Sequence, residues 1–236
     1  MSQKHIKGLQ KVTLIDYPGK IACTVFLFGC NFRCGFCHNP ELVIGNPKDN
    51  YSEEEILTFL TTRKSSLDGV CITGGEPLIS IEKDFLKKIK NMGFLVKIDT
   101  NGSFPEKLKD LIENKLIDYV AMDIKSSPEN YSLIASSKID IKKLEQSIKI
   151  ISNLPNYEFR TTILPNFHDE KEIKKTVEWL ENVTGKMPKK FVLQGFKNQG
   201  KFIDQKYQKE KDVPESFLEK LKEEIKDCFE EVEIRV

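Results

Sequence analysis

The stretch IACTVFLFGCNFRCGFCHNPE, residues 21–41, joins a continuous apolar run to a loop that carries three cysteines. An apolar run of this length is typical of a strand that is buried on both faces of a sheet. Cys30, Cys34 and Cys37 follow at spacings of four and three residues, and His38 comes directly after the last. The loop therefore offers three thiols and one imidazole at the end of a buried strand.

The rest of the chain alternates apolar runs with amphipathic stretches. Five further runs predict buried strands, at residues 69–73, 94–99, 118–124, 158–164 and 191–194. Two capping boxes predict helix starts, one at Ser52 with Glu55 and one at Asp169 with Glu172. Six strands alternating with helices indicate an α/β fold of parallel β/α units, either a doubly wound sheet or a full or partial barrel.

Length and composition narrow the class of protein. At 236 residues the chain is long enough for one compact domain, and we expect residues 1–236 to form a single domain. Its core is expected at about residues 20–195, with a C-terminal loop and helix at about residues 196–236; the loop is polar to about residue 213, and Pro214 then predicts the start of the helix.

The charge balance and the apolar runs argue against two classes of partner. Lys and Arg number 37 against 36 Asp and Glu, a net charge of +1, so nucleic acid is not expected as a main partner. The start of the chain lacks the apolar core of a signal peptide, and no apolar run is long enough to cross a bilayer. We therefore expect a cytoplasmic protein without a membrane partner, in which cysteines serve as metal ligands, nucleophiles or core residues.

Polar residues come at the same end of every predicted strand. In parallel β/α folds this carboxyl end is where ligands bind. After the cysteine loop the candidates are GGEP at 74–77, DTNG at 99–102, Asp123 with Lys125, Arg160, and Gln194. Asp123 and Lys125 are two residues apart and face the same side of a strand, so they bind a ligand or form a structural ion pair.

Three cysteines fit some metal sites better than others. A structural zinc site takes four ligands, commonly in two separated pairs, and His38 could complete such a shell only through a strained loop. A catalytic cysteine needs a separate base, and a redox pair needs only C-x-x-C. A four-iron cube held by three thiolates leaves one iron without a protein ligand.

The C-x-x-x-C-x-x-C loop after the first strand resembles the signature of the radical S-adenosylmethionine (SAM) superfamily. In that family the open iron of a [4Fe–4S] cluster chelates the methionine part of SAM, and reductive cleavage gives a 5′-deoxyadenosyl radical. The resemblance implies a partial (β/α)6 TIM-like barrel with an added C-terminal helix. It also implies one cluster held by Cys30, Cys34 and Cys37, because the other three cysteines are isolated.

The resemblance also implies a set of SAM contacts. GGEP looks like the family's methionine-binding motif, and DTNG and DIK look like polar motifs that hold the cofactor in glycyl-radical-enzyme activases. Where related activases use a late histidine at the ribose, this chain reads FVLQGF, which leaves Gln194 as the candidate. Arg160 is a candidate for the cofactor carboxylate or a partner of a nearby acid. The full set is Phe36, Gly74, Gly75, Glu76, Asp99, Asn101, Asp123, Lys125, Arg160 and Gln194.

Two segments, GLQKVTLIDYPGK at 8–20 and GCNFRCGFCHNPEL at 29–42, are similar to activating proteins of anaerobic ribonucleotide reductase and to pyruvate formate-lyase activases. The resemblance implies a radical SAM oxidoreductase that generates a glycyl radical on a partner enzyme, with anaerobic ribonucleotide reductase as the first candidate. An electron donor such as flavodoxin or ferredoxin is then needed. Two alternatives remain open: a radical SAM enzyme acting on a small molecule, similar to 7-carboxy-7-deazaguanine synthases, and a metal-bound binding module without turnover.

Overall fold

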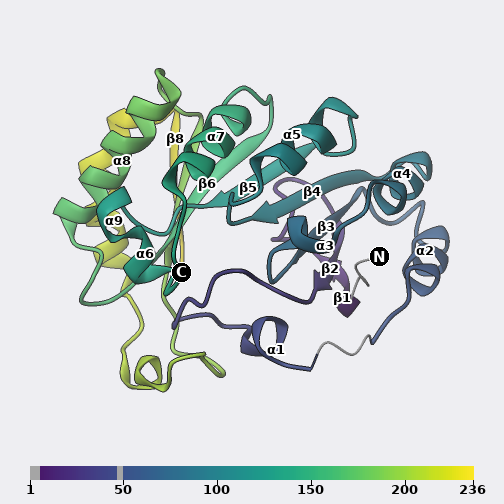
Figure 1. Cartoon of the computed structure of the whole chain (residues 1–236), viewed down its shortest axis with the longest axis horizontal. Helices are drawn as coiled ribbons and strands as arrows, with labels where there is room; N and C mark the ends of the chain where they lie inside the picture. Colours follow the sequence, from purple (N-terminus) through teal and green to yellow (C-terminus); the bar gives the residue numbers. More distant parts are fainter. Residues whose placement is uncertain (1–5, 47–49) are drawn as a thin grey trace. The chain divides into compact units, whose positions relative to one another are not determined.

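The computed structural model describes residues 6–46 and 50–236, and the chain divides into two compact units. Unit 1 comprises the described residues up to 31 together with those in 39–100 and 106–120. Unit 2 comprises residues 32–38, 101–105 and 121–236. Each unit has its own buried apolar residues and its own strands (Figure 1).

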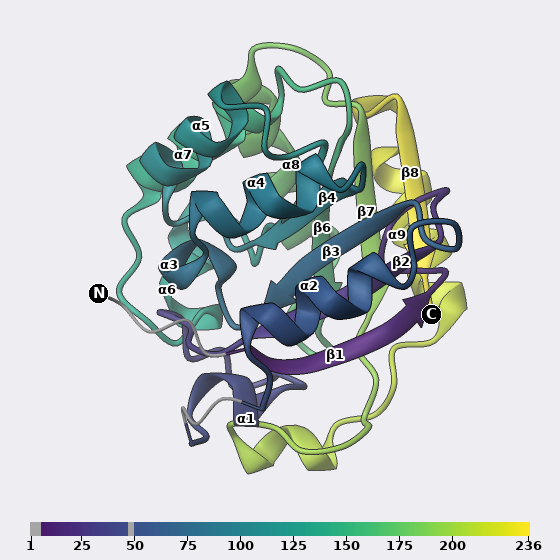
Figure 2. The same ribbon diagram turned by 90° about the vertical axis from the view of Figure 1, so that its right-hand side faces the viewer.

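Unit 1 is built on parallel strands with one antiparallel neighbour. β2 pairs with β3 and β3 with β4 in parallel, and β1 pairs with β2 in the antiparallel direction. Figure 2 shows α2 and α4 on one face of these strands. The elements are β1 Ile6–Thr13, β2 Ala22–Leu27, α1 Pro40–Val43, α2 Glu53–Thr61, β3 Gly69–Gly74, α3 Pro77–Ser80, α4 Lys83–Asn91 and β4 Leu95–Thr100.

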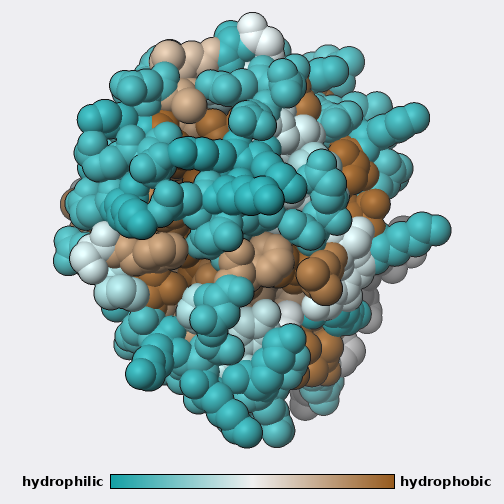
Figure 3. Space-filling view, turned by 90° about the vertical axis from the view of Figure 1, so that its left-hand side faces the viewer, coloured by the Kyte–Doolittle hydropathy of each residue, from teal (hydrophilic) through white to brown (hydrophobic). Residues whose placement is uncertain are grey.

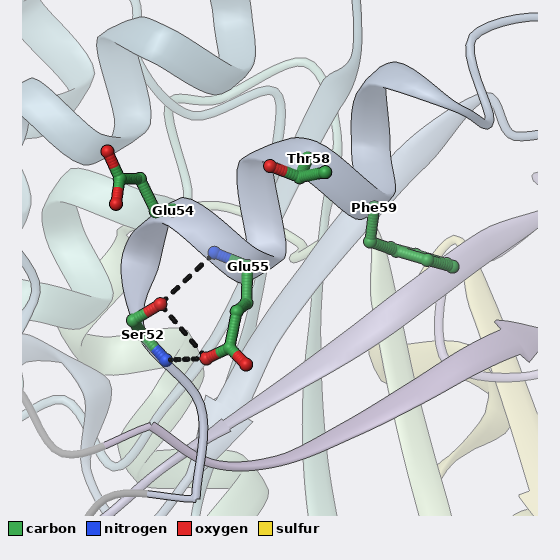
Figure 4. A pocket seen from close by; sticks show the side chains of 5 residues that line it. All are labelled: Ser52, Glu54, Glu55, Thr58 and Phe59. Atoms are coloured by element: carbon green, nitrogen blue, oxygen red, sulfur yellow. Dashed lines mark hydrogen bonds between the residues drawn. The ribbon is translucent and has the colours of Figure 1, made fainter.

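The start of α2 confirms the first predicted capping box. Ser52 Oγ accepts the N–H of Glu55 at 3.2 Å, and the Glu55 carboxylate accepts the N–H of Ser52 at 2.7 Å (Figure 4). These two bonds satisfy backbone donors that a helix start leaves unpaired. Ile56 and Leu60 then face inward and are fully buried.

Unit 2 continues the same β/α pattern. β6 pairs with β7 and β7 with β8, all in parallel. Two elements, α5 Pro105–Glu113 and β5 Tyr119–Asp123, have residues in both units. The others are α6 Pro128–Ile134, α7 Ile141–Ile151, β6 Tyr157–Ile163, α8 Glu170–Thr184, β7 Lys190–Gly195, the 3-10 helix η1 Gln205–Lys209, α9 Glu215–Ile225, the 3-10 helix η2 Lys226–Cys228 and β8 Glu231–Arg235.

The apolar stripe of α9 packs against β7 and β8, and α8 packs against α9. Leu218, Leu221 and Ile225 are the buried residues of α9. On the outside, Lys174 of α8 pairs with Glu224 of α9 at 2.5 Å. Figure 3 views the molecule from the side on which Figure 1 draws these two helices, and this face is mainly hydrophilic with small hydrophobic areas.

The α/β class is confirmed, because the six predicted apolar runs are β2 to β7. The C-terminal residues Glu231–Arg235 form a further strand, β8. The strand β1 was not predicted, since its sequence IKGLQKVT has no continuous apolar run and its middle residues are partly or fully exposed. Among the helices of the described residues, none is both long and apolar enough to span a bilayer.

The second predicted capping box is only half right. Asp169 Oδ1 accepts the N–H of Glu172 at 2.8 Å, as predicted, but the N–H of Asp169 donates to the carbonyl of Phe167. The Glu172 carboxylate instead accepts hydrogen bonds from Ser126 Oγ at 2.5 Å and from the Ser127 N–H at 2.9 Å. Glu172 therefore ties α8 to the segment that follows β5.

His168 makes a second tie between these segments. Its Nδ1 accepts the N–H of Leu164 at 2.9 Å, so the proton is on Nε2, which lies 3.0 Å from the Lys125 carbonyl oxygen and donates to it. Burial lowers the pKa of His168 from its usual 6.5 to about 4. The buried ring is therefore neutral, and it fixes the backbone of Lys125 at the end of β5.

A His168→Gln variant tests this tie through the pH dependence of stability. A histidine whose folded-state pKa lies below its unfolded value stabilises the fold fully above the unfolded pKa and loses that contribution as pH falls towards the folded pKa. The window here runs from pH 6.5 down to about 4. We expect the stability difference between wild type and variant, measured by urea unfolding, to shrink by about 2 kcal/mol between pH 7.5 and pH 5. An unchanged difference would mean that His168 titrates normally.

Candidate functional site

The cysteine loop is shared between the two units: Cys30 belongs to unit 1, and Cys34 and Cys37 belong to unit 2. Each part is described within its own unit. In the part of the chain that the structure describes, none of the six cysteines is in a disulfide. No group of three or more His, Cys, Asp or Glu side chains among residues 6–46 and 50–236 is arranged to hold a single metal ion.

In unit 1 the backbone before Cys30 is closed against the GGEP turn. The N–H of Gly75 donates to the Leu27 carbonyl at 2.9 Å, and the N–H of Glu76 donates to the Gly29 carbonyl at 2.7 Å. A Cβ at Gly75 would lie 2.0 Å from the Gly29 oxygen, and Gly74 has a φ of +122°. The two glycines are therefore required for the close approach of two backbone segments at the start of the cysteine loop.

The Glu76 side chain is fully buried and is held by its own unit. Its Oε1 accepts the N–H of Leu78 at 3.0 Å, which caps the start of α3, and the hydroxyl of Thr100 at 2.8 Å. This carboxylate links the GGEP turn to the end of β4. Glu76 thus has a structural role that sequence reasoning did not assign to it.

Asp99, the predicted cofactor residue at the end of β4, forms an ion pair with Lys97. The Lys97 side chain is 1% exposed and that of Asp99 is 13% exposed. Cys71 Sγ lies 3.8 Å from the Asp99 carboxylate and 3.9 Å from Lys97 Nζ, and the ammonium also lies over the ring of Tyr119. A buried ammonium thus fixes the position of the Asp99 carboxylate.

In unit 2 the second and third cysteines lie on a tight turn. The N–H of Cys37 donates to the carbonyl of Cys34 at 3.0 Å, and the N–H of Arg33 donates to the carbonyl of Ala135. Cys34 is buried, and burial raises the pKa of its thiol, while the nearby Lys125 ammonium acts in the opposite direction. Lys125 Nζ also lies 5.7 Å from the ring centre of Phe36. The structure therefore brings three predicted residues, Cys34, Phe36 and Lys125, together.

Asp123 lies between two cations in unit 2. Its carboxylate accepts a hydrogen bond from Arg160 Nε at 2.7 Å and lies 3.3 Å from Lys125 Nζ. Burial opposes ionisation, but the Arg160 and Lys125 charges hold the pKa of Asp123 well below its usual range. The predicted ion pair between Asp123 and Lys125 therefore exists. Its cation, Lys125, also lies close to Cys34 and over the ring of Phe36, where a ligand could bind.

The Arg160 side chain is itself positioned by a fully buried carboxylate. Arg160 Nη1 lies 3.9 Å from Glu158, and Arg235 of β8 makes two hydrogen bonds to Glu158, at 3.1 and 2.9 Å. Sequence reasoning missed Glu158, although it is two residues before Arg160 and therefore on the same face of β6. Arg235 carried no comparable signal, because its partner is 77 positions away.

The two remaining predicted residues differ in burial. Asn101 is buried, and its side-chain oxygen accepts from the N–H of Ser103 at 3.0 Å, which shapes the DTNG turn. Gly102 has a φ of +79°, and a Cβ there would lie 2.1 Å from the methyl carbon of Met122. Gln194 is the residue before the last one of β7, and it is exposed.

A surface pocket of about 580 Å³ lies on a different part of unit 1. Figure 4 shows its lining, which comes from the N-cap of α2 and from the helix itself: Ser52, Glu54, Glu55, Thr58 and Phe59. None of these is a predicted site residue. We therefore place the candidate site at the carboxyl ends of the strands and not in this pocket.

Comparison with known proteins identifies the family. A family model described as the radical SAM superfamily matches residues 24–180. A protein of Methanocaldococcus jannaschii named as a putative glycyl-radical enzyme activating enzyme is 38% identical over 185 residues, which cover 73% of this chain and 75% of the relative. A pyruvate formate-lyase-activating enzyme of Clostridium pasteurianum is 30% identical over 192 residues, or 78% of this chain and 79% of that enzyme.

A solved structure agrees with the family at the level of the fold. A domain of a pyruvate-formate lyase-activating enzyme from Bacteroides vulgatus matches with a TM-score of 0.56 and 19% identity, over 71% of this chain and 99% of that domain. The predicted radical SAM type of α/β fold, built of TIM-like β/α units, is thereby confirmed. The chain belongs to the radical SAM superfamily of enzymes, and it is related in sequence to proteins named as activating enzymes of glycyl-radical enzymes.

Proposed function

We propose that this enzyme generates a glycyl radical on a partner protein, with an anaerobic ribonucleotide reductase as the first candidate partner. The observation that carries the proposal is the 38% identity to a protein named as a putative glycyl-radical enzyme activating enzyme. Radical SAM enzymes use a [4Fe–4S] cluster and SAM. When bound, these groups supply a 5′-deoxyadenosyl radical, which can remove a hydrogen atom from the α-carbon of a glycine.

Cys30, Cys34 and Cys37 would hold the single cluster. The donor set fits, because all three residues are cysteines that lie outside any disulfide and thiolates are the ligands of iron–sulfur clusters. A cube binds each thiolate on a different iron, so the three sulfur atoms need not converge on one point as they would around a single ion. Burial keeps the Cys34 thiol protonated, so its binding to iron would release a proton.

The predicted SAM contacts supply complementary charges. In unit 2, Lys125 and Arg160 would attract the cofactor carboxylate, while Asp123 keeps both cations in place. Phe36 would contact the adenine, and Gln194 is the candidate at the ribose. In unit 1, Gly74, Gly75, Glu76 and Asp99 would surround the methionine part, and Asn101 of the DTNG turn completes the set.

The remaining proposals concern the setting of the reaction. We propose a single radical SAM domain that spans residues 1–236. Its strands would be accessible at their carboxyl ends, because a backbone glycine of another protein would have to reach them. An external electron donor, such as a flavodoxin or ferredoxin, would reduce the cluster. We place the enzyme in the cytoplasm, where cysteines stay reduced.

A Cys34→Ala variant tests the ligand assignment. We expect it to lose its cluster after anaerobic reconstitution, since two thiolates hold a cube poorly. The measurement is the iron and sulfide content per chain together with the EPR spectrum of the reduced protein. Cys228→Ala, which removes a cysteine outside the loop, is the matched control and should keep the full iron content. Equal iron in both variants would refute the assignment.

A Lys97→Met variant tests how Asp99 is held. Removing one partner of a buried ion pair leaves an uncompensated charge. We therefore expect the free energy of unfolding to fall by about 3 kcal/mol. Adding Asp99→Asn to Lys97→Met should recover much of this loss, because no buried charge then remains. Thermal and urea unfolding measure the effect, and Lys87→Met, which changes an exposed side chain of α4, is the control. A stable single variant would show that Asp99 does not depend on Lys97.

The decisive experiment for function uses the anaerobically purified, reduced enzyme with SAM. It is mixed with candidate glycyl-radical enzymes while EPR is recorded and 5′-deoxyadenosine is measured. We expect a glycyl doublet with the true partner and none when the acceptor glycine of that partner is replaced by alanine. Release of 5′-deoxyadenosine without a doublet from any candidate would favour a small-molecule substrate. No cleavage at all would favour a binding module.

A further inference from the structure

A polar segment of unit 2, residues 197–213, contacts the cysteine loop directly; we call it the strap. It connects β7 to α9 and contains η1. The N–H of Asp204 in the strap donates to the carbonyl of Gly35 at 2.9 Å. Gly35 lies between Cys34 and Cys37, so this hydrogen bond fixes the main chain between the second and third cysteines.

The strap residue Tyr207 also packs against Gly35. A Cβ built at Gly35 would lie 2.9 Å from a ring carbon of Tyr207 and 3.0 Å from the Cβ of Asp204. The rings of Phe36 and Tyr207 meet edge to face, with 6.0 Å between their centres. Tyr207 therefore leaves no room for a side chain at Gly35 and packs against the aromatic residue that follows it.

The third part of the loop is held by the same aromatic group. The His38 ring lies 5.1 Å from Phe202 and 5.8 Å from Phe196, measured between ring centres. Phe196 and Phe202 stack on each other at 5.3 Å, and Tyr207 lies 6.0 Å from Phe196. Phe196 is fully buried and Phe202 is 6% exposed. These contacts bury apolar surface in a segment whose sequence is otherwise polar.

The strap also has internal bonds that keep it in one conformation. Asn198 Nδ2 donates to the carbonyls of Gln208 at 2.9 Å and Glu210 at 2.7 Å. The N–H of Val213 donates to the Phe196 carbonyl at 3.0 Å, which closes the base of the strap. The Asp204 side chain accepts the N–H of Lys206 at 3.0 Å and begins η1. The contact with Gly35 is therefore made by an ordered element.

We propose that Tyr207 is a positioning residue for the cysteine loop. It acts through Gly35 and Phe36, fixing the backbone between Cys34 and Cys37 and covering this part of the loop from solvent. The effect on a cluster rests on the proposed function, whereas the contact with Gly35 does not. The Tyr207 ring thus joins the aromatic residues Phe196 and Phe202 to Phe36 of the cysteine loop.

Four variants of the full chain test the proposal. Tyr207→Ala removes the ring, and Tyr207→Phe restores the ring without the hydroxyl. Lys209→Ala changes an exposed residue of the same 3-10 helix and is the matched control. Gly35→Ala introduces a methyl group that clashes with the Tyr207 ring while Tyr207 itself is unchanged. This variant therefore tests the same contact if Tyr207→Ala folds poorly.

The first readout needs no cluster. Hydrogen exchange of the Asp204 amide reports directly on its bond to Gly35, and we expect Tyr207→Ala to accelerate it by about tenfold. Gly35→Ala should accelerate this exchange too. In the double variant the acceleration should be smaller than the product of the accelerations in the two single variants, because both changes disrupt the same contact. Tyr207→Phe and Lys209→Ala should exchange like the wild type.

The second readout uses the reconstituted protein. We expect air to bleach the cluster about tenfold faster in Tyr207→Ala than in Tyr207→Phe or Lys209→Ala, and the reduction potential to shift only in the first of these. Unchanged exchange of the Asp204 amide in Tyr207→Ala would show that Tyr207 does not maintain the bond between Asp204 and Gly35. Faster exchange with an unchanged bleaching rate and an unchanged reduction potential would show that Tyr207 does not position the loop for the cluster. If the wild type itself takes up no cluster, the proposed function fails, and the exchange data alone decide whether Tyr207 positions the loop.

Discussion

A charge inside a protein needs a partner of opposite sign, because an unpaired buried ion costs several kcal/mol or more. In this chain the partner repeatedly lies two residues away along the chain, within one strand or just after its end. The pairs are Lys97 with Asp99, Asp123 with Lys125, Glu158 with Arg160, and Glu233 with Arg235. Because each charged side chain has a partner of opposite charge two residues away, it is stable in the interior without a bound ligand. The same side chains can then interact with a ligand when it binds.

In unit 2 these pairs join into a continuous chain of ions. Arg235 binds Glu158, Glu158 lies beside Arg160, and Arg160 binds Asp123, which also pairs with Lys125. The C-terminal strand β8 therefore supports residues on β5 and β6. The physical consequence is that Lys125 and Arg160 are oriented before any ligand arrives, so little ordering is left for binding.

Features that depend on residues close together in the sequence could be predicted from it, whereas most features that depend on residues far apart were missed. Buried strands were found because an apolar run is a local signal, and β1 was missed because an exposed edge strand has none. The pairing of Asp123 with Lys125 followed from their spacing, and the same spacing would have found Lys97 and Glu158. The role of His168 was out of reach, because one of its partners is a backbone oxygen 43 residues away. Glu76 was placed at the right turn, but its bonds to Leu78 and Thr100 depend on how that turn folds.

The cysteine loop shows the same division between local and distant causes. Its spacing of cysteines is visible in the sequence, but the bonds that shape it are made by main-chain atoms of remote segments. In unit 1 the Gly29 carbonyl accepts from Glu76, and in unit 2 the Gly35 carbonyl accepts from Asp204. Because these bonds use main-chain atoms only, they hold the loop whether or not the thiols bind a metal. The ordering of the loop is then part of folding, and the binding energy of a metal cluster need not be spent on it.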